Sequence, residues 1–85
     1  ENIHKEVWLD TQNKWFYTEW EIRSSQEPDI VMTAFKASAY ASYRIDDIHV
    51  IQKAEGLSYE FELEQGDRDI TILFNEEGIL VSPTH

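Results

Sequence analysis

The sequence predicts an α+β fold in which an antiparallel β-sheet of about five strands packs on one α-helix, in the order β-β-α-β-β-β(-β). Residues 45–82 contain several stretches of alternating apolar and polar residues separated by turn signals, the pattern of an antiparallel meander. Residues 28–43 instead repeat apolar residues at helical spacing. A length of 85 residues suits one domain with one modest core. We therefore expect residues 1–85 to form a single domain.

Residues 1–23 are predicted to form an N-terminal β-hairpin, with strands at 7–10 and 15–22 around a short polar turn. In the second strand, alternate residues should share a face, because successive side chains point to opposite sides of a sheet. If Phe16 and Trp20 face the core, Trp15 and Tyr17 face outward. The hairpin could also be the end of a preceding unit.

The helix is predicted over residues 28–43. Pro28 suits a first helical turn, where its missing N–H costs nothing, and Asp29 places negative charge at the positive end of the helix dipole. Three- and four-residue steps put six residues on one face: Ile30, Val31, Ala34, Phe35, Ser38 and Ala41. The small members of this face should let a sheet approach closely.

The meander, residues 45–82, contains the most regular strand of the chain. In residues 58–64, Tyr59, Phe61 and Leu63 alternate with three glutamates, so one set should face the helix and the other the solvent. Ile70, Ile72 and Phe74 continue the pattern in the next strand. Gly56, Gly66 and Gly78 lie in the predicted turns.

Composition narrows the choice of partners. The chain has 17 acidic residues against 7 Lys and Arg, a formal net charge of −10, which disfavours nucleic acid and anionic membranes. It has no cysteine and no long apolar run, so neither disulfides nor membrane insertion is expected. The chain starts at Glu1 without an apolar export segment, so we expect a mature or trimmed fragment.

The segments together resemble a known family. The stretch Trp20-Glu21-Ile22, the helix opened by Pro28, the sequence YASYRIDDI at 40–48, the Tyr-Glu-Phe-Glu-Leu-Glu strand at 59–64 and residues 74–78 resemble the PepSY-like periplasmic proteins of Gram-negative bacteria. The resemblance covers residues 18–82. It implies a fold related to β-lactamase-inhibitor protein, often present in tandem, together with export to the periplasm or cell surface and a role in inhibition or binding. It supplies no catalytic residues.

No enzyme motif is present. No serine lies in a Gly-x-Ser-x-Gly turn, and the sequence contains no Walker A loop and no Gly-x-Gly-x-x-Gly stretch. Glu60, Glu62 and Glu64 have a spacing that glycosidases could use, but an exposed strand face offers no desolvated cleft. We therefore expect neither catalysis nor a cofactor, and a small hydrolase is the least favoured alternative.

A non-catalytic binding or inhibitory module remains as the leading hypothesis, with a protein or peptide as partner. Exposed Trp and Tyr favour contact surfaces, and an acidic strand face favours a basic partner. The candidate binding residues are Trp8, Trp15, Tyr17, Glu60, Glu62 and Glu64. Alternatively, the glutamates form a solvated face, and a second sheet, another domain or a homodimer mate covers the aromatic side chains.

Two further alternatives stay open. Asp46, Asp47 and His49 could begin a calcium or zinc site, since Asp47 and His49 share a strand face, although two ligands do not hold a metal. The aspartates could instead bond local backbone N–H groups. The other alternative is a purely structural repeat of a larger envelope protein.

Overall fold

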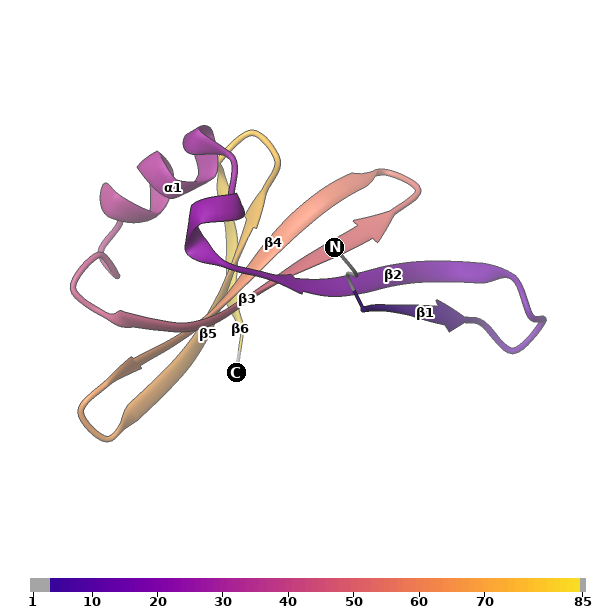
Figure 1. Ribbon diagram of the computed structural model, residues 1–85, viewed down its shortest axis with the longest axis horizontal. Coiled ribbons are helices and arrows are strands. Elements are labelled where there is room, and N and C mark those ends of the chain that lie inside the picture. Colours follow the sequence, from indigo (N-terminus) through magenta and orange to yellow (C-terminus); the bar gives the residue numbers. More distant parts are fainter. Residues whose placement is uncertain (1–3, 85) are drawn as a thin grey trace.

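A computed structural model describes residues 4–84, and its six strands form one antiparallel sheet in sequence order (Figure 1). The strands are β1 (Lys5–Leu9), β2 (Trp15–Ile22), β3 (Arg44–Lys53), β4 (Gly56–Gln65), β5 (Arg68–Asn75) and β6 (Leu80–Thr84). Between β2 and β3 lie the 3-10 helix η1 (Ser24–Gln26) and α1 (Asp29–Lys36). The α+β class and the order of elements are confirmed, but the sheet has six strands rather than about five. Residues 1–3 and His85 of the predicted domain lie outside the described residues.

The core lies between α1 and one face of the sheet. Phe35 of the helix stacks on Phe61 of β4 with 5.2 Å between ring centroids, and Phe61 meets Phe74 of β5 edge-on at 5.4 Å. The buried apolar residues are Val31, Phe35, Ile48, Val50, Tyr59, Phe61, Leu63, Ile72 and Phe74. The alternation read from residues 59–63 and 70–74 thus correctly predicts the inward set, with Ile70 half-buried.

The helix is shorter than the predicted 28–43. α1 ends at Lys36, and turns follow it. Ser38 explains this end: its hydroxyl donates to the carbonyl of Phe35 at 2.7 Å and accepts the N–H of Tyr40 at 3.1 Å. Such side-chain bonds offer the backbone an alternative to helical bonding. The predicted apolar face is wrong at two positions: Ala41 lies beyond the end of α1 and is exposed, and Ile30, inside α1, is 54% exposed.

The hairpin β1–β2 extends away from α1, and every residue of β1 is exposed (Figure 1). A register irregularity between Trp8 and Leu9 places Leu9 opposite Trp15, so Phe16 has no partner in the ladder. The expected alternation of this strand is therefore wrong at its start. Trp15 lies on the side of Thr18, to whose Oγ1 its indole N–H donates at 2.8 Å, while Phe16 meets Tyr17 edge-on at 5.2 Å.

The other face of the sheet, opposite α1, is called the open face below. Strand alternation and the strand register place these residues of β1 to β5 on the open face: Glu6, Trp8, Tyr17, Glu19, Glu21, Arg44, Asp47, His49, Ile51, Lys53, Ser58, Glu60, Glu62, Glu64, Asp69, Thr71, Leu73 and Asn75. Eight of these are acidic. The apolar residues of these strands are buried under α1, so the acidic residues that alternate with them gather on the open face.

Candidate functional site

The open face is aromatic at its hairpin end. Trp8 of β1 and Tyr17 of β2 are directly opposite each other in the ladder, and their rings stack with 5.6 Å between centroids at an angle of 21°. Trp8 is 47% exposed and Phe16, beside Tyr17, is 56% exposed. Aromatic pairs of this kind offer a large contact area with little side-chain freedom to lose.

His49, on the central strand β3, lies among carboxylates. Its Nδ1 is 3.2 Å from Oε2 of Glu19 on β2, and its Nε2 is 3.4 Å from Oε2 of Glu62 on β4. Two more glutamates, Glu21 and Glu60, are its direct neighbours in the ladder on either side. The imidazole therefore bridges acidic side chains contributed by the two strands on either side of β3.

The crowding of negative charge changes the acid–base properties of this face. Partial burial raises the pKa of Glu60, and repulsion from Glu19 and Glu62 raises it further, while His49 acts in the opposite direction. The pKa of Tyr17 is raised by desolvation and by the charges of Glu19, Glu6 and Glu60. A positively charged group brought to this surface would relieve the repulsion.

At the far end of the face, Arg44 is occupied by acidic partners. Its guanidinium pairs with Glu64 and lies 3.0 Å from Oδ1 of Asp46. The hydrogen bond that Arg44 donates to Glu64 raises the pKa of Arg44, and the negative charge of Asp46 raises it further. A register irregularity between Ile45 and Asp47 takes Asp46 out of the alternation, so Asp46 meets Arg44 and does not join His49.

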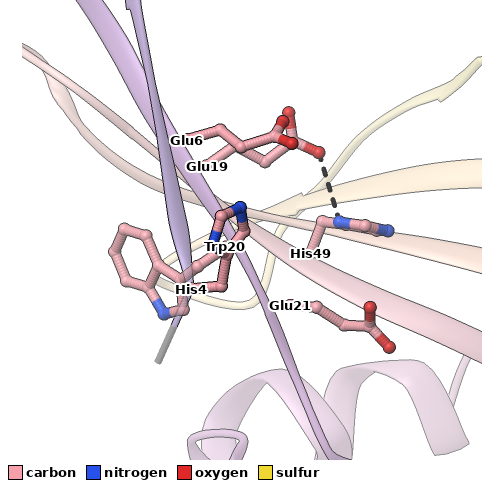
Figure 2. A pocket seen from close by; sticks show the side chains of 6 residues that line it. All are labelled: His4, Glu6, Glu19, Trp20, Glu21 and His49. Carbon is pink, nitrogen blue, oxygen red and sulfur yellow. Dashed lines mark ion pairs between the residues drawn. The ribbon is translucent and has the colours of Figure 1, made fainter. Parts of the chain in front are cut away.

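A shallow hollow of about 170 Å³ opens beside His49 and is lined by His4, Glu6, Glu19, Trp20, Glu21 and His49. Figure 2 shows Glu6 and Glu19 together, the link from Glu19 to His49, and the His4 ring near Trp20. Typical small-molecule sites measure roughly 300–1,000 Å³. The hollow is therefore of a size for an ion or for one side chain of a partner.

The structure separates the predicted site residues into groups. Trp8 stacks on Tyr17, Glu60 and Glu62 lie around His49, and Glu64 is held by Arg44. Trp15 lies on the other side of the hairpin with Thr18. Of the metal candidates, Asp47 and His49 converge with Glu62, each offering a ligand atom within 4.8 Å of the others, whereas Asp46 does not take part.

Sequence reasoning missed Glu6, Glu19, Glu21 and Phe16 as members of this region. The alternation of Tyr17, Glu19 and Glu21 was a usable signal that these three share a face. Their proximity to His49, however, depends on which strand pairs with β2.

Within residues 4–84, no helix has the length and apolar character needed to cross a membrane.

Comparison with known proteins places this fold in a class of small helix-on-sheet modules. The chain matches, over residues 1–82, the family described as "Putative beta-lactamase-inhibitor-like, PepSY-like". The chain belongs to this family. A search of curated proteins found no match.

Three solved structures share the fold. A BLIP-like protein of Bacteroides fragilis is 30% identical with a TM-score of 0.86, over 96% of this chain and 60% of its own. A DUF2874 family protein of Bacteroides ovatus is 18% identical with a TM-score of 0.90, over 98% of this chain and 62% of its own. A protein of Bacteroides eggerthii described as "putative periplasmic" is 17% identical with a TM-score of 0.87, over 96% and 62%. This chain thus spans about 60% of the length of these solved chains.

Proposed function

We propose that this chain is a non-catalytic, inhibitor-like module that binds a protein or peptide with basic side chains through its open face. The observation that carries the proposal is the stacked pair of the exposed Trp8 and the half-buried Tyr17 on the same face as the carboxylates around His49. Aromatic anchors surrounded by charged groups are characteristic of energetically important contact sites. Membership of a family described as β-lactamase-inhibitor-like supports the same role.

Charge selects the kind of partner. The open face carries eight acidic residues, and the whole chain has a formal charge of −10. Such a field accelerates encounter with a basic surface and repels phosphate backbones and anionic lipids. A second copy presents the same negative face, so a homodimer through two open faces is disfavoured.

Matched variants test this function. Purified β-lactamases and proteins of a periplasmic extract serve as probes, with dissociation constants measured by surface plasmon resonance. Replacing Trp8 and Tyr17 together by Ala should weaken binding by about tenfold or more, because aromatic anchors commonly contribute 2 kcal/mol or more. Trp15→Ala is the control, since it removes an exposed indole from the other side of the same hairpin. Equal losses for the control and the double variant would move the site to that other side.

The electrostatic part has its own readout. Glu19→Gln with Glu60→Gln should reduce the association rate and flatten its dependence on salt, because both carboxylates lie in the proposed contact region. Glu77→Gln, in the exposed β5–β6 turn, removes the same kind of charge elsewhere. Identical salt dependence in all three proteins would contradict a basic partner on this face.

We also propose that the protein is exported to the periplasm or cell surface. Family membership and the description of the Bacteroides eggerthii relative support this. Expression of the natural gene product in its host, followed by osmotic shock, should release the protein with periplasmic markers. Recovery with cytosolic markers would count against export.

A structural repeat in a larger envelope protein is a second candidate. It is favoured by the helix side of the hairpin, where Val7, Leu9 and Trp15 are 60%, 53% and 44% exposed. Contiguous apolar side chains of this kind often contact another unit. In the natural gene product, hydrogen exchange of β1 should then be slower than in the 85-residue chain, and equal exchange rates would remove this candidate.

A further inference from the structure

The strand register brings three potential metal ligands to one point of the open face. Asp47 and His49 are two residues apart on β3 and so point to the same side, and Glu62 of β4 is the ladder partner of Asp47. Each of the three offers one ligand atom within 4.8 Å of the others, and all three residues are half-buried. Because the backbone ladder sets their positions, no long loop has to be ordered for them to meet.

One distance already matches a metal centre. A tetrahedral zinc ion bonded at about 2.0–2.1 Å holds its ligand atoms about 3.3 Å apart. Nε2 of His49 and Oε2 of Glu62 are 3.4 Å apart. An ion between these two atoms would need only small side-chain rotations.

A fourth residue orients the imidazole. Nδ1 of His49 lies 3.2 Å from Oε2 of Glu19, so this carboxylate is placed to accept a proton carried on Nδ1, which leaves Nε2 available to an ion shared with Glu62. A ligating histidine almost always donates its other ring N–H to a carboxylate, a backbone carbonyl or water, and this partner fixes the tautomer and raises the basicity of the ligand. This brace distinguishes the group from acidic residues that merely lie close together on a surface.

Among the described residues, the direct ladder neighbours of His49 carry negative charge and none of them is a cation. Glu21 and Glu60 flank His49 in the ladder, whereas Arg44 is already bound to Glu64 and Asp46. A divalent ion would offset this excess of negative charge. The imidazole ligand favours zinc and similar transition metals over calcium, which takes oxygen ligands only.

We propose that Asp47, His49 and Glu62 bind a divalent transition-metal ion of the zinc type, with Glu19 as the residue that positions the imidazole. Three protein ligands leave the fourth tetrahedral position for water or for a side chain of a bound partner. The site is independent of the protein-binding function proposed above, because it requires only this chain and the ion.

Isothermal titration of the purified chain with zinc, after removal of metals with a chelator, tests the site. One zinc ion per chain is expected, with binding weakened at least tenfold by His49→Gln. Glu19→Gln should weaken it by roughly 10–100-fold, the usual effect of removing such a brace. Asp69→Asn is the matched control, since it removes one carboxylate from the same face outside the triad, and it should change the affinity by less than about twofold.

A second measurement keeps the test decisive if a variant folds poorly. In the unaltered chain, long-range ¹⁵N NMR should show the proton of His49 on Nδ1, and zinc should shift the Nε2 resonance of His49. Absence of zinc binding at submillimolar concentration would overturn the proposal. The proposal would also be overturned if calcium bound as tightly as zinc and if the His49 and Asp69 variants lost equal amounts of affinity. Such a result would indicate diffuse attraction of cations to an acidic surface. A zinc-induced shift confined to His4 would also overturn the proposal.

Discussion

Glu27 gives this small domain a pH dependence opposite to that of most acidic side chains. The residue follows η1, is only 7% exposed, and neither of its carboxylate oxygens has a hydrogen-bond partner among the described residues. Burial raises its pKa from the usual 4.5 to about 7. The pKa of the buried Tyr59 is raised mainly by its own burial and then by the negative charges of Glu76 and Glu27. Glu27 therefore lies close to this phenol.

The sign follows from comparing the two states. Below pH 4.5 the carboxyl is protonated in both the folded and the unfolded chain, and the stability contributed by the neutral group is fully present. As the pH rises from 4.5 to about 7, the unfolded chain ionises first and the free energy of unfolding falls. The complete difference corresponds to about 3 kcal/mol, and access of water to the site reduces the expected loss to about 1–2 kcal/mol.

Glu27→Gln replaces the carboxyl by a neutral group of the same shape, so the free energy of unfolding of this variant should fall less through this pH range than that of the unaltered chain. Urea unfolding followed by Trp fluorescence, between about pH 4 and about pH 8, measures the effect. Glu77→Gln is the control, because it removes one acidic charge from an exposed turn. At the upper pH the Glu27 variant should exceed the control by about 1–2 kcal/mol, and at the lower pH the difference should vanish. A difference between the two variants that does not vary with pH would refute the reasoning.

Three other perturbations test the packing. Phe61→Ala removes a fully buried ring and should cost about 3–5 kcal/mol, enough to leave the chain largely unfolded by circular dichroism; a cooperative transition with little loss would contradict the assigned core. Gly78→Ala should destabilise the fold more than Gly66→Ala in denaturant titrations. Both glycines have positive φ, but only at Gly78 would an added Cβ lie 3.0 Å from the Ile30 carbonyl oxygen. Equal losses of stability would show that backbone strain alone matters. Ser38→Ala removes two hydrogen bonds at the end of α1 and should cost about 1 kcal/mol in the same assay, whereas an unchanged midpoint would show that the helix ends for another reason.

Much of the core could be predicted, but the site could be predicted only in part. The inward positions of Tyr59, Phe61 and Leu63 follow from alternation alone. The surroundings of His49 do not, because Glu19 lies 30 residues before it and Glu62 lies 13 residues after it in the chain. Only the pairing of β2 and β4 on either side of β3 brings these carboxylates to the imidazole.

Local irregularities account for the remaining errors. The irregularity beside Leu9 puts Trp15 on the side opposite to the expected one and leaves Phe16 unpaired, and the irregularity beside Ile45 directs Asp46 to Arg44. A bulge moves every side chain on one side of it relative to those on the other, yet it has no strong signature in composition.

The sequence by itself determined the α+β class, the order of elements, the inward residues of the meander and the acidity of its outer face. Each of these depends on periodicity or charge, which are properties of neighbouring residues and of the strand pleat. The tertiary structure alone decided that Trp8 stacks on Tyr17 and that His49 is held between Glu19 and Glu62. Contacts of this kind depend on strand register, which the packing of the whole sheet on its helix sets rather than any single segment.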